Sequence, residues 1–414
     1  MVPKGWSSVQ AQDVCKSISV GVVIKPTQYY VPEGYGVKAF RSANVREGFI
    51  NDSDWVYFSH EGHAINKKSH LKTGDVLIVR TGYPGTACVV TPEFEGSNAI
   101  DIVIARPDMD KIIPEYLCAY TNSHIGKSQV LDLQGGMAQK HLNVGAYQVL
   151  KINLPPLREQ KKIAQILSTW DKAISVTEKL LTNSQQQKKA LMQQLLTGKK
   201  RLLDENGVRF STEWEFKRIS EIATRVQRKN DAAEHPILTI SSLSGFVRQD
   251  ERYSRYMAGE SVKNYILLKK GEFAYNKGNS KTYEFGCIFD LEAYEAGLVP
   301  HVYVCFRLKN GLSHRYFKYL FEADYLKPQL GALVNTGVRN NGLLNIKPTE
   351  FMQTKVPVPC FEEQESIADM LYNSSRTIRV LQDKLACLKD EKKALMQQLL
   401  TGKRRVKVDE AVAV

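Results

Sequence analysis

The feature that most constrains this chain is a stretch of sequence that occurs twice. The sequence KKALMQQLLTGK covers residues 188–199 and again residues 392–403, at an offset of 403 − 199 = 204. The same offset relates Glu159 to Glu363. A repeat at this spacing predicts two similar halves, each made of a globular stretch followed by one long helix.

Each repeated stretch ends a heptad pattern, in which core positions recur at alternating steps of four and three residues. Such a pattern predicts a long helix with a single packing seam, here polar in its middle. Because the two seams have equal length and register, we expect the helices to pack against each other as an antiparallel coiled coil. The apolar residues predicted to pack between the helices are Ile163, Leu167, Trp170, Ile174, Leu181, Leu191, Leu195, Ile367, Leu371, Ile378, Leu381, Leu385, Leu388, Leu395 and Leu399.

Proline and glycine mark where these helices begin and end. Pro155 and Pro156 precede the first helix, Pro357 and Pro359 precede the second, and Gly198 is suited to a C-cap. The expected division of the chain is a first globular domain over 1–153, a helical region over 154–201, a second globular domain over 202–357, a second helical region over 358–405 and a flexible tail over 406–414.

The globular stretches carry signals of mixed α/β structure. Strands are predicted over 75–80 and 99–105, and a short amphipathic helix over 114–124. The second stretch follows the first loosely, with a corresponding strand over 302–308. The predicted fold is therefore two α/β domains separated by two long antiparallel helices, with an internal pseudo-twofold repeat.

Composition favours a folded protein with a polyanionic partner. The chain has 414 residues, a formal net charge of +13 and 43% hydrophobic residues. It shows no membrane-length apolar run and no signal-peptide core, so a cytoplasmic location is expected. Charge alone does not establish a nucleic-acid partner, since many basic proteins bind none. The seven cysteines lack metal-site spacing and are expected to be buried free thiols.

Catalytic and metal-binding motifs are not evident. Gly126-Lys127-Ser128 resembles the end of a phosphate-binding loop, but Thr121 stands where its first glycine is required. The two histidines of His60-Glu61-Gly62-His63 are spaced too closely for a zinc-binding helix. We therefore expect no catalytic residues, no metal site and no enzymatic activity in the chain by itself.

Several loops combine basic or amide side chains with glycine, as DNA-reading loops do. An ordinary solvated turn is the alternative for each of them. The stretch from Arg248 to Tyr283 also alternates basic and aromatic residues, which could stack on nucleic acid or pack in the domain. The candidate DNA-binding residues are Arg41, Ser42, Asn44, Arg46, Arg80, Thr81, Tyr83, Gln139, Lys140, Ser241, Ser242, Lys277, Asn279, Lys281, Arg339, Asn340 and Asn341.

These patterns together resemble a known family, the specificity subunits of Type I restriction-modification enzymes. The resemblance covers essentially the whole chain. It is carried by LPPLREQ at 154–160 and its echo at 356–364, by the duplicated LLTGK endings, and by RNNGLLNI at 339–346, which looks like the family's lead-in to the helix. The two copies differ where Cys360-Phe361 replaces the Pro-Leu that follows Pro155.

The resemblance implies a non-catalytic DNA-binding subunit that binds no cofactor itself. Each globular domain would read one half of a bipartite, asymmetric target in double-stranded DNA, and the helix pair would set the gap. The implied partners are two modification subunits, which methylate adenine with S-adenosylmethionine, and often restriction subunits that use ATP and Mg²⁺. An interaction scaffold for proteins is the alternative. A self-contained methyltransferase or nuclease is disfavoured by the missing motifs.

Overall fold

The computed structural model describes residues 2–133, 141–231, 234–252, 259–278, 280–334 and 344–408. It divides into two compact units. Unit 1 comprises residues 1–179 and 382–414, and unit 2 comprises residues 180–381. Each unit therefore contains one globular domain, part of the first long helix and part of the second. Within the described residues, no helix has the length and apolar character needed to cross a membrane.

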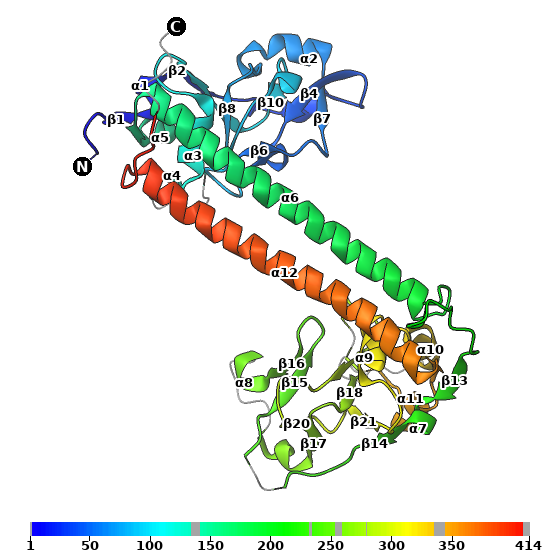
Figure 1. Ribbon diagram of the computed structural model, residues 1–414. Helices are drawn as coiled ribbons and strands as arrows, with labels where there is room; N and C mark the ends of the chain where they lie inside the picture. The colour runs from blue at the N-terminus through cyan, green and yellow to red at the C-terminus, as the bar shows by residue number, and fades with distance from the viewer. Residues whose placement is uncertain are drawn as a thin grey trace. The chain divides into compact units, whose positions relative to one another are not determined.

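The globular part of unit 1 is built from two four-stranded sheets and two strand pairs (Figure 1). One sheet has the order β2-β11-β8-β9 and is antiparallel throughout, and the other has the order β10-β4-β7-β3. The strands are β1 (Ser7–Gln10), β2 (Cys15–Val20), β3 (Tyr30–Val31), β4 (Gly36–Phe40), β5 (Val45–Arg46), β6 (Phe49–Ile50), β7 (Val56–Ser59), β8 (Val76–Val79), β9 (Ala87–Val89), β10 (Asn98–Ala99), β11 (Ile102–Pro107) and β12 (Lys151–Leu154).

Short helices cover and connect these strands. They are α1 (Ala11–Val14), α2 (His60–Ile65), α3 (Pro114–Asn122), α4 (His124–Leu133) and α5 (Val144–Gln148), with 3-10 turns η1 (Pro26–Tyr29), η2 (Ser42–Asn44), η3 (Lys67–Ser69) and η4 (Pro92–Phe94). The strand expected over 99–105 is interrupted, because Asp101 adopts a left-handed backbone with φ of 50° between β10 and β11.

Unit 2 repeats the antiparallel sheet with the order β14-β21-β18-β19. Its strands are β13 (Glu215–Arg218), β14 (Ala223–Arg225), β15 (Leu238–Ser241), β16 (Gly245–Arg248), β17 (Ile266–Lys269), β18 (Phe273–Asn276), β19 (Cys287–Asp290), β20 (Ala296–Val299), β21 (Val304–Leu308) and β22 (Lys355–Val358). Its short helices are α7 (Ile219–Ile222), α8 (Gln249–Arg252), η5 (Gly259–Asn264), α9 (His314–Glu322), α10 (Lys327–Leu333) and α11 (Pro348–Met352).

The two long helices have nearly equal lengths. The first, α6 (Leu157–Leu195), has 39 residues and the second, α12 (Phe361–Leu400), has 40. Every predicted seam residue is buried or half-buried, whereas neighbours such as Val176 and Val380 are exposed. In unit 1, Lys392 pairs with Asp171 at 2.5 Å and Lys389 with Glu178 at 2.7 Å. Residue numbers rise along one helix as they fall along the other, which confirms the antiparallel pair.

Each long helix also closes the core of the unit in which it begins. In unit 1, Ile163 and Leu167 of α6 pack with Tyr116 of α3 and with Leu399 of α12. In unit 2, Ile367 and Leu371 of α12 pack with Tyr316 of α9 and with Leu195 of α6. The heptad seam is therefore continuous with the domain cores. The cysteine prediction is only partly correct: all seven are free, but Cys15 and Cys360 are half-buried and Cys387 on α12 is exposed.

A buried glutamate joins each domain to both helices. In unit 2, Glu363 accepts hydrogen bonds from Arg201 at 2.6 and 2.7 Å and from the Trp214 indole at 2.8 Å. In unit 1, Glu159 accepts from Arg405 at 2.5 and 3.0 Å and from the Trp6 indole at 3.3 Å. The two glutamates are 204 positions apart in the sequence, and so are the two arginines. The internal repeat therefore includes this interaction.

The first turn of each long helix is held by a buried glutamine. Gln160 donates to the Pro155 carbonyl and accepts from the backbone of Ile113. Gln364 makes the same two contacts, with Pro359 and with the backbone of Ser313. Ile113 and Ser313 immediately precede α3 and α9. The glutamine therefore sets where each of these domain helices begins relative to the long helix.

We predict that Glu363→Gln lowers the free energy of unfolding by about 3 kcal/mol, because it leaves the largely buried Arg201 guanidinium without a countercharge. Chemical denaturation of the full chain measures the change. The matched control is Glu362→Gln, which removes the same charge from the exposed neighbouring position and should change stability by no more than about 0.5 kcal/mol. Equal losses in the two variants would contradict a structural role for the buried carboxylate.

Candidate nucleic-acid interface

The first candidate loop of unit 1, residues 41–46, is organised by Asn44. This side chain is fully buried; it accepts a hydrogen bond from the Arg41 backbone and donates to the carbonyls of Asn51 and Ser53. Asn44 therefore shapes the loop and exposes no amide surface to a base. Arg41 remains partly exposed and pairs with Asp54 at 3.1 Å.

The other two members of this loop lie nearer to solvent. Ser42 is half-buried in η2, and Arg46 is exposed at the end of β5. The Arg46 guanidinium donates to the backbone carbonyls of Ser42 and Val45. These bonds hold the guanidinium against the loop while leaving part of it accessible.

The second candidate loop is the turn between β8 and β9, and Arg80 anchors it. The Arg80 guanidinium is almost buried; it donates to the Leu142 carbonyl at 3.0 Å, pairs with Asp101 at 2.6 Å and contacts His141. Thr81 also contacts the His141 ring, at 2.9 Å. A guanidinium committed to these partners positions the loop rather than presenting itself to a ligand.

Tyr83 lies at the tip of the same turn and is exposed to solvent. Its side chain is 83% exposed. It stands between Gly82 and Gly85, whose φ angles of 90° and 83° favour glycine. The structure therefore presents an aromatic side chain to solvent from a turn that Arg80 fixes.

In unit 2 the candidate residues lie on two separate turns. Ser241 and Ser242 are half-buried at the turn of the β15–β16 hairpin, and Lys281 is exposed in the β18–β19 connection. Lys277 is half-buried and donates to the Ile346 carbonyl at 3.1 Å. Burial lowers the pKa of Lys277, and the nearby Arg225 charge lowers it further.

Arg80 and Lys277 occupy corresponding positions, as their spacing from Gly74 and Gly271 predicts. The Arg80 carbonyl accepts from the backbone of Leu142, and the Lys277 carbonyl accepts from the backbone of Leu344. Both side chains also donate to a nearby backbone carbonyl. The correspondence is confirmed, while the side chain itself differs between the halves.

Six candidates lie outside the described residues, so nothing further is derived for them. They are Gln139, Lys140, Asn279, Arg339, Asn340 and Asn341. Within the described ranges, no group of three or more His, Cys, Asp or Glu side chains is arranged to hold a metal ion.

The contacts of Asp101 and His141 that position the second loop were not predicted from the sequence. Neither was the clamp, which consists of the ion pairs Glu159–Arg405 and Glu363–Arg201. The repeat contained a signal for the clamp, since Glu159, Arg201, Glu363 and Arg405 are related by the same offset of 204. No comparable sequence signal pairs Arg80 with Asp101.

The comparisons with known proteins agree with this architecture. Residues 3–183 match the family described as the Type I restriction modification DNA specificity domain. The chain is 25% identical to the MjaVIII specificity subunit of Methanocaldococcus jannaschii, over 98% of this chain and 94% of that one. It is 23% identical to the EcoKI specificity subunit of Escherichia coli, over 88% and 81% of the two chains.

Solved structures show the same fold. The type I restriction-modification S subunit from M. genitalium has a TM-score of 0.55 at 13% identity and covers 96% of both chains. The HsdS subunit from Thermoanaerobacter tengcongensis has a TM-score of 0.50 at 16% identity, over 97% and 98% of the chains. Over nearly its whole length the chain is similar to type I restriction-modification specificity subunits. An interaction scaffold without DNA specificity is not favoured.

The chain pairs a repeated framework with unlike loops in its two halves. The contacts of Tyr116 with the Asn153 carbonyl and of Tyr316 with the Pro357 carbonyl are equivalent. Gln129 and Gln329 each exchange two hydrogen bonds with the backbone of a lysine, Lys151 or Lys355. The framework is retained in both halves, whereas the turns it supports have diverged.

Proposed function

We propose that each half of this chain reads one part of a bipartite, asymmetric target in double-stranded DNA. The observation that carries the proposal is the retained framework with divergent turns: Arg80 in one half corresponds to Lys277 in the other. Two different readers on one framework suit a target whose two halves differ in sequence. The net charge of +13 supplies the long-range attraction to phosphate.

In this proposal the recognition domains are residues 1–153 and 202–357, and the helical regions 154–201 and 358–405 join them. The exposed residues of the turns, among them Tyr83 and Lys281, contact DNA directly. The buried Arg80 and Asn44 act by holding their loops in place. The helix pair sets the spacing between the two half-sites.

The chain itself would be non-catalytic, with the chemistry supplied by partners. Two modification subunits would dock along the helix pair and methylate adenine with S-adenosylmethionine, and restriction subunits with ATP and Mg²⁺ would complete the assembly. Support for partners comes from the family, and from a solved structure of similar fold, TM-score 0.57 at 16% identity, that concerns complex assembly in a type I system.

The decisive experiment compares methylated adenine across the genome in cells with and without this chain, while the partner modification subunit is present and active. We expect a bipartite motif that is methylated only when the chain is present. That motif would define both half-sites and the gap between them. Unchanged methylation would reject the proposal.

We predict that Tyr83→Ala weakens binding to DNA that carries this motif by about 1 kcal/mol or more, which is fivefold or more in Kd. The reason is that Tyr83 is the exposed tip of a fixed turn. Titration of labelled duplexes measures the loss, which should concern one half-site only. The control Tyr35→Ala removes an equally large exposed side chain, 72% exposed, from outside the candidate turns. Equal losses in both variants would contradict the assignment.

We also predict that four residues inserted before Lys188 change the gap in the methylated motif or abolish methylation. The insertion lengthens α6 by about 6 Å and rotates the chain beyond it by roughly 40°. Replacing residues 184–187 by alanine, with no change in length, should leave the gap as it was. Methylation mapping reads out both variants, and an unaltered gap after the insertion would count against the helix as a spacer.

A further inference from the structure

A cavity of about 630 Å³ lies in unit 1 where the globular domain meets the helix pair. Its walls come from the β5–β6 turn, β9, α3, α6 and α12. The volume is within the range of small-molecule sites, roughly 300–1,000 Å³. The apolar side chains of the wall include Phe49, Ile50, Phe94, Leu167 and Met396.

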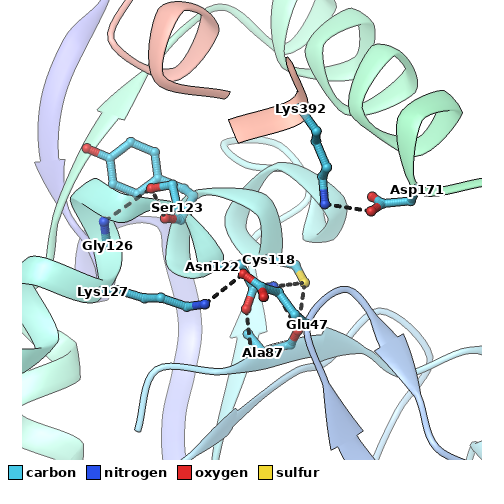
Figure 2. Close-up of polar contacts among 10 residues, drawn as sticks. Glu47, Ala87, Cys118, Asn122, Ser123, Gly126, Lys127, Asp171 and Lys392 are labelled. Carbon is cyan, nitrogen blue, oxygen red and sulfur yellow. Dashed lines mark hydrogen bonds and ion pairs between the residues drawn. The ribbon is translucent and has the colours of Figure 1, made fainter. Parts of the chain in front are cut away.

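The rim of this cavity is acidic. Its carboxylates are Glu47, Asp52, Glu93, Glu115 and Asp171, and Lys392 is the cationic side chain among the lining residues that the structure describes. Figure 2 shows Lys392 reaching from α12 to Asp171 on α6, and Lys127 of α4 reaching to Glu47. The cavity therefore has an excess of negative charge on a chain whose net charge is +13.

Two of the rim carboxylates carry no ion pair within the described part of the chain. These are Glu93 and Glu115, both exposed to solvent at the cavity. Hydrogen bonds lower the pKa of Glu93, and the bond from the Thr91 side chain has the largest effect. This carboxylate is therefore charged at neutral pH. The rim thus has negative charge that the cations of the described residues do not neutralise.

The repeat explains why the cavity exists in unit 1. Helices α3 and α9 correspond at an offset of 200, so Ala119 corresponds to Tyr319. In unit 2, the Tyr319 hydroxyl contacts Ser375 at 3.4 Å, and the Lys188 ammonium lies 5.3 Å from the Tyr319 ring centre.

The two neighbours of Tyr319 have counterparts on the wall of the cavity. Ser375 corresponds to Asp171 and Lys188 to Lys392 at the offset of 204, and both counterparts line the cavity, as Ala119 does. Tyr319 therefore occupies in unit 2 the place that the small Ala119 side chain leaves open in unit 1.

The corresponding helices α3 and α9 also differ in charge where they face the long helices. In unit 2, Arg315 of α9 pairs with Glu365 at 2.5 Å and Asp369 at 2.7 Å on α12. The corresponding residue in unit 1 is Glu115, which has the opposite charge and lines the cavity. Unit 2 fills and neutralises this junction with its own side chains, whereas unit 1 leaves it open and acidic.

Two lining residues, Asp52 and Phe94, contact the ammonium group of Lys38 beside the cavity. Lys38 pairs with Asp52 at 2.9 Å, and its ammonium lies 4.7 Å from the Trp55 ring centre and 5.2 Å from that of Phe94. Carboxylates beside aromatic faces form a favourable environment for such cations. Apolar walls would add contact with methylene groups, which a compact hydrated metal ion cannot exploit.

We propose that this cavity binds an aliphatic polyamine, with its methylene chain against the apolar wall and its ammonium groups at Glu93, Glu115 and the other rim carboxylates. An anionic ligand is opposed by Glu93 and Glu115, the two rim carboxylates without an ion pair among the described residues. The general basicity of the chain also opposes nonspecific binding of polycations, so any tight polyamine binding requires a local acidic site. The proposal does not depend on the reading of DNA.

Isothermal titration of the full chain with spermidine, without DNA and at low ionic strength, tests this. We expect saturable binding of one spermidine per chain. The double variant Glu93→Gln/Glu115→Gln should weaken it by about fivefold, because two exposed ion pairs are lost. The matched control Glu205→Gln/Glu213→Gln removes the same charge from exposed positions of unit 2 and should bind as the unmodified chain does.

A second variant tests the cavity itself rather than its charge. Ala119→Tyr introduces the side chain that unit 2 carries at the corresponding position, and it should abolish spermidine binding by filling the space. Circular dichroism and thermal unfolding establish that the variant is folded, and the charge variant keeps the test independent of that outcome. Absence of saturable binding, or binding that neither variant weakens, would overturn the proposal.

Discussion

The structure depends on a carboxylate that is buried and paired at the first turn of each long helix. Removing a carboxylate from water costs several kcal/mol unless charge and hydrogen bonds compensate. Glu363, which is fully buried, is compensated by a bidentate arginine and an indole N–H. The position is also favourable because the helix N-terminus attracts negative charge. A shift of the helix pair in either unit would leave this charge unpaired.

The clamp links three distant parts of the sequence in each unit. In unit 1 these are Trp6 near the start of the domain, Glu159 at the start of α6 and Arg405 after the end of α12. The arginine donors raise the strength of the contact because each is held by two hydrogen bonds. Hydrogen bonding to the glutamates raises the pKa of both Arg201 and Arg405, so both guanidinium groups stay charged across the physiological range. Domain, first helix and second helix are therefore positioned by one group.

The helices and the repeat could be predicted from the sequence because their signals are local and periodic. The seam positions recur every three or four residues, and burial in the structure follows them along both helices. Proline before each helix and Gly198 after the first set the limits to within a few residues. Periodicity reports which face of a helix is buried, and here it indicated that the two helices pack side by side. Their antiparallel direction is established by the ion pairs of Lys392 with Asp171 and of Lys389 with Glu178.

The candidate interface could be predicted only in part, because exposure in a loop depends on partners far away in the sequence. Arg80 and Tyr83 belong to one turn and have the same local signals, yet Arg80 is nearly buried against Asp101 and His141 while Tyr83 is exposed. Asn44 has the composition of a base-reading residue but is buried as the centre of its loop. Sequence indicated which turns combine polar side chains with glycine, and the three-dimensional contacts decide which of those side chains are available.

The internal repeat allows equivalent positions of unit 1 and unit 2 to be compared directly. Residues that hold the framework, such as Tyr116 and Tyr316, make equivalent contacts in the two units. One turn of helix later, Ala119 and Tyr319 differ by the whole volume of a phenol ring, at a junction where loss of packing normally destabilises a protein. Unit 2 folds with this junction filled by Tyr319, so the open cavity at the junction of unit 1 is not a requirement of the fold. The difference is therefore better explained by something that the open junction accommodates than by stability.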